Sequence, residues 1–197
     1  MRLVLASGSA IRRTLLANAG LSLTVDPADI DEGAIKTRMR SQSAPAMTAA
    51  IELASTKAQA VSSRHPGALV IGADQLLTLG NEWFDKPADR AAAARHLEQL
   101  SGRAHQLVCG VAVVQDGTEL WRTAQSVVMH MRPLSRAFIE TYLDQAGDTV
   151  LASVGAYQLE GRGAQLFTAI EGDYFTVLGL PLLPLLAFLR QRGIMPT

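Results

Sequence analysis

The stretch MRLVLASGSAIRR, residues 1–13, decides how this fold begins. Its apolar residues 3–6 predict a buried strand, the Ser-Gly-Ser that follows predicts a turn, and residues 11–19 predict a helix. Such a turn leaves backbone N–H groups unpaired at the helix start, where the helix dipole favours an anion. Arg12 and Arg13 lie in the first helical turn, where positive charge opposes the dipole. The stretch therefore indicates either a phosphate site or a solvated helix start with two surface arginines.

Strands and helices alternate along the rest of the chain. Helices are predicted at residues 46–62 and after the caps Asp89 and Ser135, and the apolar stretch 177–189 predicts a buried turn followed by a core helix. Strands are predicted at residues 21–25, 68–73, 76–79, 83–84, 106–114, 119–131 and 164–170. Turns or loops are predicted at residues 26–33 and 39–45. We expect an α/β fold with a long mixed β-sheet and flanking helices. Residues 1–197 would form a single domain with two lobes around a cleft, and the lobe boundary stays open.

Composition limits the partners of this chain. The 18 basic and 18 acidic residues cancel, which argues against a nucleic-acid-binding surface and makes any anion site local. The only cysteine, Cys109, excludes an intramolecular disulfide, and its apolar surroundings predict a core position. The apolar runs are too short for a signal peptide or a membrane span. We expect a soluble, cytoplasmic protein with no nucleic-acid or membrane partner.

Polar residues near the ends of predicted elements are candidates for chemistry. Asp74 follows the predicted strand 68–73, where open α/β sheets place ligand groups, and Glu32 lies in an acidic turn. Lys57 stands among small apolar residues of a helix, and Lys86 precedes a proline that favours an extended backbone. Taken singly, each has an ordinary explanation: a cap, a solvated loop charge, a lysine reaching for water, or an exposed turn.

Together, these residues have a chemical logic. Two carboxylates can hold a hard divalent cation, and lysines and arginines can neutralise a polyphosphate. That combination is the minimum for metal-assisted hydrolysis of a phosphoanhydride.

A series of short motifs resembles the Maf family of nucleoside triphosphate pyrophosphatases along nearly the whole chain. The motifs are LASGSAIRR (5–13), DE (31–32), LASTKA (53–58), GADQ (72–75), DKP (85–87), LSG (100–102), GAYQLEG (155–161) and VLGLP (177–181). Any one of them alone is weak, but their shared order makes the resemblance specific.

The resemblance implies hydrolysis of a nucleoside triphosphate to the monophosphate and pyrophosphate, with Mg²⁺ or Mn²⁺. Asp74 falls at the family's catalytic aspartate, as proton acceptor or as a metal ligand together with Glu32. Lys57 and Lys86 fall at its basic positions. The phosphate-binding turn would contain Ser7, Ser9, Arg12 and Arg13. A homodimer stays open.

Three positions match those that separate substrate branches of the family: Ile11, Gln75 and Glu160. Gln75 and Glu160 resemble the 7-methyl-GTP branch, whereas the dTTP/UTP branch tends to have Thr and Gln. Ile11 fits neither branch, and Ala10 replaces the usual proline. Because a carboxylate only accepts hydrogen bonds, Glu160 suits the N–H groups of guanine.

Two alternatives remain from the sequence. One is a dTTP/UTP-type pyrophosphatase of the same family, and the other is a non-catalytic nucleotide-binding regulator of cell division. The presence of both Glu32 and Asp74 favours turnover over simple binding, since a pure binder needs no carboxylates beside a polyanion.

Overall fold

A computed structural model describes residues 2–196, which divide into two compact units. Unit 1 contains the chain up to Gln75, Cys109–Gln125 and the chain from Tyr174 onward. Unit 2 contains Leu76–Val108 and Ser126–Asp173. Three long strands have residues in both units. The predicted mixed α/β fold is confirmed, and the predicted cleft stays a prediction.

Helices and strands alternate as expected. The helices are α1 (Ala10–Asn18), α2 (Glu32–Ser41), α3 (Ala46–Ser62), α4 (Arg90–Leu100), α5 (Arg136–Ala146), α6 (Tyr174–Val177) and α7 (Leu182–Gln191), with 3₁₀ helices η1 (Gly147–Ala152), η2 (Val154–Ala156) and η3 (Arg162–Leu166). The strands are β1 (Leu3–Leu5), β2 (Thr24–Val25), β3 (Leu69–Leu79), β4 (Glu82–Phe84), β5 (Ala104–Gln115), β6 (Thr118–Met131) and β7 (Phe167–Glu171). Within residues 2–196, none of the helices has both the length and the apolarity needed to cross a bilayer.

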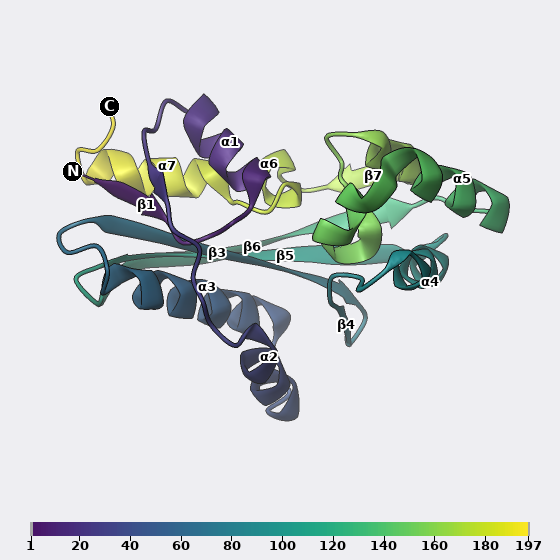
Figure 1. The fold of residues 1–197 in the computed structure, drawn as a ribbon, viewed down its shortest axis with the longest axis horizontal. Coiled ribbons are helices and arrows are strands. Elements are labelled where there is room, and N and C mark those ends of the chain that lie inside the picture. The colour runs from purple at the N-terminus through teal and green to yellow at the C-terminus, as the bar shows by residue number, and fades with distance from the viewer. Residues whose placement is uncertain (1, 197) are drawn as a thin grey trace. The chain divides into compact units, whose positions relative to one another are not determined.

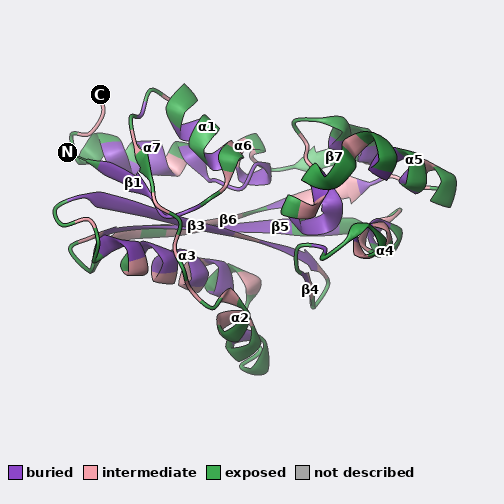
Figure 2. Cartoon of the chain, viewed as in Figure 1, coloured by how far each residue is buried: buried purple, intermediate pink, exposed green. Residues whose placement is uncertain are grey.

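Unit 1 is a sheet with helices on both faces. Its strands follow the order β2-β1-β3-β5-β6, and β1 pairs in parallel with β2 and β3. Helix α3 lies on one face, and α1 and α7 lie on the other (Figure 1). Because both faces are covered, β1 and residues 69–74 of β3 are buried, as Figure 2 shows. Such burial explains their continuous apolar sequences.

Helix α3 packs unusually close to the sheet. A Cβ at Gly72 of β3 would collide with the Ala54 carbonyl oxygen and lie 2.8 Å from the Ala58 nitrogen, and a Cβ at Gly110 of β5 would collide with the backbone of Ala50. These alanines have no exposed surface. The glycines of the sheet and the alanines of the helix therefore bring the two backbones together.

Unit 2 contains two antiparallel pairings and a buried polar pair. Strand β4 pairs with β3, and β7 pairs with β6. The polar pair is His105 and Tyr157, whose Nε2 and hydroxyl group lie 2.8 Å apart. Burial lowers the pKa of His105 to about 4 and raises the pKa of Tyr157 well above its usual value. Both side chains are therefore neutral at neutral pH.

The structure corrects the predictions for two segments near the candidate site. Residues 32–41 form α2, where a turn and a loop were expected, because Asp31 caps that helix by accepting from Ala34 N at 2.8 Å. Strand β3 does not end at residue 73 but runs through Asp74 to Leu79. It changes partner there, from β1 at residues 69–71 to β4 at residues 77–79. Asp74 is thus a strand residue just beyond the end of β1.

Two predicted strands are shorter than expected. Residues 21–23 lie outside β2, and residues 164–166 belong to η3 instead of β7. In each segment one apolar side chain, Leu21 or Leu166, is buried in the core although its residue belongs to no strand.

We expect Gly72→Ala to destabilise the fold strongly. The added methyl group would overlap backbone atoms of α3, which cannot move aside like a flexible side chain. The expected loss is about 3 kcal/mol or more in the free energy of unfolding, measured by urea denaturation. Gly80→Asn is the matched control, since Gly80 has a φ of +59° and no atom within 4 Å of its added Cβ. A loss below about 1 kcal/mol for Gly72→Ala would contradict the close packing.

Candidate active site

A buried lysine between two carboxylates forms the centre of the candidate site. Lys57 Nζ lies 2.5 Å from Asp74 Oδ1 and 2.7 Å from Glu32 Oε1. The side chains of Lys57 and Asp74 are 9% and 8% exposed, whereas that of Glu32 is 44% exposed. They come from α3, β3 and the first residue of α2. The close packing of α3 on β3 lets the buried lysine reach the strand.

Asp74 has one carboxylate oxygen without a partner. Its Oδ2 is buried and makes no hydrogen bond to any residue that the structure describes. A buried carboxylate oxygen is costly without a partner, and such atoms often mark places where a ligand or water binds. The carboxylate is therefore anchored through Oδ1 and available through Oδ2.

Arg12 is buried with neutral partners. Its Nη1 donates to Ser7 Oγ at 3.0 Å and to the Ala73 carbonyl oxygen at 2.9 Å, and its Nε donates to the Gly179 carbonyl oxygen at 2.7 Å. These oxygens accept from Nε and Nη1 of the guanidinium but carry no full negative charge. A buried guanidinium in such a place favours an anion beside it.

The Ser-Gly-Ser turn joins β1 to α1 as predicted. Ser9 caps α1, since its Oγ accepts from Arg12 N at 3.4 Å, and Ser7 Oγ accepts from Ser9 N at 3.3 Å. Ser7 is buried and Arg13 is exposed. The turn thus combines hydroxyl groups, a helix start and one buried arginine.

The end of β1 explains why Arg12 reaches β3. Ala6 N donates to the Ile71 carbonyl oxygen at 2.8 Å, which completes the pairing of β1 with β3. The carbonyl oxygen of Ala73, two residues further on, faces the same edge of the strand. Arg12 takes the place of the missing strand there. Arg12 and Lys57 therefore contact consecutive residues of β3, Ala73 and Asp74.

The side-chain amide of Gln75 donates hydrogen bonds to backbone carbonyl groups. Its Nε2 donates to the carbonyl oxygens of Thr176 at 3.1 Å and Val177 at 3.0 Å. Its predicted role in base selection stays a prediction.

The roles of the other predicted residues also stay predictions. Ile11 is half-buried on α1. Lys86 follows β4, and Glu160 lies in a turn before Gly161; both are exposed residues of unit 2.

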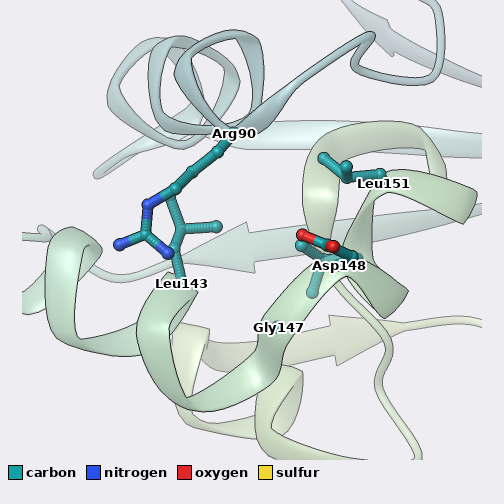
Figure 3. A pocket seen from close by; sticks show the side chains of 6 residues that line it. Arg90, Leu143, Gly147, Asp148 and Leu151 are labelled. Carbon is teal, nitrogen blue, oxygen red and sulfur yellow. The ribbon is translucent and has the colours of Figure 1, made fainter.

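A small hollow in unit 2 contains none of the predicted site residues. Its lining comprises Arg90, Leu143, Gly147, Asp148, Val150 and Leu151 (Figure 3). Arg90 is already engaged there, since its Nη2 lies 2.7 Å from Asp144 Oδ1 and 3.1 Å from the Glu140 carbonyl oxygen. The hollow offers no chemistry comparable to the Lys57 group.

Sequence reasoning predicted a buried turn in the stretch 177–189 but missed the side chains that bind the turn at residues 176–179. Its carbonyl oxygens receive the side chains of Gln75, Cys109 and Arg12. The signal was Gly179 in the VLGLP motif, whose φ of +91° favours glycine. The motif showed that this turn was special but not which donors it would meet.

Comparisons with known proteins agree with this picture. The sequence model of the Maf-like protein family matches residues 2–192. A nucleoside triphosphate pyrophosphatase of Hyphomonas neptunium is 51% identical over 100% of this chain and 99% of its own. A nucleoside triphosphate pyrophosphatase of Rhodopseudomonas palustris is 55% identical over 98% of this chain and 95% of its own length. A 7-methyl-GTP pyrophosphatase of Mesorhizobium japonicum is 52% identical over 98% and 96%.

Both the matched length and these identities confirm the resemblance that the motifs predicted. The chain therefore belongs to the Maf-like protein family.

Proposed function

We propose that this protein hydrolyses nucleoside triphosphates to the monophosphate and pyrophosphate. The observation that carries the proposal is the carboxylate of Asp74, paired with Lys57 through Oδ1 and unpaired at the buried Oδ2. Arg12, which is buried with neutral partners on the adjacent residue of β3, adds the positive charge that a triphosphate needs. The printed names of the relatives, nucleoside triphosphate pyrophosphatase and 7-methyl-GTP pyrophosphatase, support the same reaction.

The proposed reaction assigns separate tasks to the charged groups. The phosphates bind at the Ser7–Ser9 turn and at Arg12, with Arg13 adding charge from the surface. Lys57 and Lys86 balance negative charge that develops on the phosphate oxygens.

Asp74 acts on the attacking water. The water oxygen forms a bond to the α-phosphorus, and the bond from that phosphorus to the bridging oxygen breaks, which releases pyrophosphate. Oδ2 of Asp74 orients the water and accepts its proton. Alternatively, Oδ2 would hold a cation, which would position the water and lower its pKa. Its anchored Oδ1 fixes the direction in which Oδ2 faces.

The carboxylates fit a divalent cation such as Mg²⁺ or Mn²⁺. Residues 2–196 contain no group of three or more His, Cys, Asp or Glu side chains that could hold a metal unaided. Mg²⁺, however, commonly binds through one or two carboxylates together with substrate phosphates and water. Asp74 Oδ2 and the carboxylate of Glu32 would supply the protein oxygens. When bound, the cation would neutralise charge on the phosphate oxygens.

For the base, we propose a preference for guanine-type triphosphates, above all 7-methyl-GTP. Glu160 is an exposed carboxylate that can accept from N1–H and the exocyclic amine of guanine. Methylation at N7 adds positive charge to the ring, which a carboxylate also favours. Ile11 would add apolar contact but no stacking surface.

The reaction is tested by incubating a triphosphate with the protein and Mg²⁺ or Mn²⁺ and identifying the products by phosphorus NMR. We expect monophosphate and pyrophosphate, and loss of turnover in excess chelator. Diphosphate with orthophosphate would contradict the assigned bond. Tight nucleotide binding without any turnover would favour the regulator instead.

Asp74→Asn should abolish most activity without unfolding the protein. The amide keeps the shape but loses the charge and basicity of Oδ2, so we expect kcat to fall by roughly 10²-fold or more. Glu119→Gln is the control, because Glu119 Oε2 binds Ser55 on α3 at 2.5 Å but lies outside the Lys57 group. Steady-state kinetics and circular dichroism measure both. A folded Asp74→Asn protein with near-normal kcat would assign Asp74 a structural role only.

Glu160→Gln should narrow the preference among bases. The amide replaces one acceptor by a donor, so kcat/KM for 7-methyl-GTP and GTP should fall by about tenfold relative to dTTP and UTP. Competition kinetics with the four nucleotides measures this ratio. If the unmodified protein has its highest kcat/KM with dTTP or UTP, the assignment of Glu160 to guanine is wrong.

A further inference from the structure

Both N–H donors of the Gln75 amide hold a turn of the backbone. The partners of Nε2, at 3.1 and 3.0 Å, are the carbonyl oxygens of Thr176 and Val177. Because both partners are acceptors, the amide must present its NH₂ group to them. Only Oε1 remains for any other partner, so a direct role in reading a base would rest on one acceptor.

The turn at residues 176–179 is held by side chains in addition to its own backbone hydrogen bond, from Gly179 N to the carbonyl oxygen of Thr176 at 3.0 Å. It ends α6, and carbonyl groups at the end of a helix lack helical donors. The carbonyl oxygen of Thr176 also accepts from Cys109 Sγ at 3.1 Å, and that of Gly179 accepts from Arg12 Nε at 2.7 Å. Side chains from β3, β5 and α1 therefore hold this turn in place.

Gly179 brings Gln75 and Arg12 to the same point. A Cβ at this residue would lie 3.4 Å from Nε and Nη2 of Arg12 and 3.5 Å from Oε1 of Gln75. Both side chains thus pack against the bare Cα of one glycine. A shift of the turn would move the acceptor of Arg12 as well as those of Gln75.

We propose that Gln75 is a positioning residue, which holds the 176–179 turn against β3 and thereby fixes the Arg12 guanidinium beside Ala73 and Asp74. The catalytic part of this inference rests on the proposed function. Gln75 then affects catalysis through Arg12 and the turn, and not through a contact with the base.

This role differs from base reading in its effect on different nucleotides. Displacing Arg12 weakens the interaction with phosphates, which every nucleoside triphosphate shares. Loss of Gln75 should therefore lower kcat/KM by the same factor for purine and pyrimidine substrates. A residue that reads the base would instead change their ratio.

The experiment compares three variants. Gln75→Leu removes both donors, and Gln75→Glu puts a carboxylate oxygen against two carbonyl oxygens. Gln115→Leu is the matched control, since Gln115 Nε2 also donates to a backbone carbonyl of unit 1, that of Gly67 at 3.3 Å, but far from the turn in sequence. Thermal unfolding establishes that each variant is folded at the assay temperature.

Cys109 provides a readout independent of activity. It is the only cysteine, has no exposed surface and donates to the carbonyl oxygen of Thr176. Loosening the turn should expose its thiol. We expect dithionitrobenzoate to modify Cys109 about tenfold faster or more in both Gln75 variants, the scale expected from losing two neutral hydrogen bonds, and at the original rate in Gln115→Leu.

The second measurement is kcat/KM with 7-methyl-GTP, GTP, dTTP and UTP. We expect about a tenfold loss with each nucleotide in Gln75→Leu. An unchanged rate of Cys109 modification would overturn the contact with the turn, and a loss confined to purines would overturn the positioning role. If the unmodified protein hydrolyses none of the four, the proposed function fails with the catalytic part of this inference, while Cys109 modification still decides whether Gln75 holds the turn.

Discussion

The close approach of α3 to β3 determines where the charges of unit 1 meet. Without a side chain at Gly72, the strand can lie against the backbone of Ala54 and Ala58. Lys57, on the same turn of α3 as these alanines, then reaches Asp74 with its ammonium group. Burying a charged group away from water costs several kcal/mol of desolvation free energy, and a close partner of opposite charge offsets that cost. The packing and the ion pair therefore depend on each other.

Three consecutive residues of β3 join parts of the chain that are distant in sequence. The carbonyl of Ala73 meets Arg12, the carboxylate of Asp74 meets Lys57, and the amide of Gln75 meets the turn at residues 176–179. The Ala73 carbonyl is an edge group of β3, left open because β1 ends before it. Asp74 and Gln75 use their side chains instead, which project from opposite faces of the strand. Rigid strand geometry therefore sets the spacing of the three contacts.

The sequence predicted the helices and strands better than the tertiary contacts between them. Helix α3 has the expected bounds, and the strands predicted at residues 106–114 and 119–131 lie within β5 and β6. Helix α2 was missed because its polar, arginine-rich sequence has little apolar periodicity, although Asp31 is a good cap. The continuation of β3 through Asp74 was missed because a charged residue usually ends a buried strand. Here the ion pair to Lys57 makes the charge tolerable.

The same limit applies to the candidate site. Motif order placed Glu32, Lys57 and Asp74 in one group, but no local pattern could show that the lysine lies between the carboxylates, since tertiary packing alone brings them together. In the first thirteen residues, the positive charges of Arg12 and Arg13 oppose the dipole at a helix start, and the sequence did not show what offsets this unfavourable interaction. For Arg13 the answer is water, because it is exposed.

For Arg12 the structure of residues 2–196 shows neutral hydrogen-bond partners but no compensating negative charge. Carbonyl and hydroxyl oxygens accept from Nε and Nη1, which lowers the free-energy cost of burying the guanidinium, yet neutral dipoles compensate a full charge less well than an anion does. The hydrogen bonds therefore fix the guanidinium in place before any ligand arrives, and a polyanion would supply the missing charge. An arginine held in this way loses little side-chain entropy when a phosphate binds, so the same contacts that stabilise the fold also prepare the site.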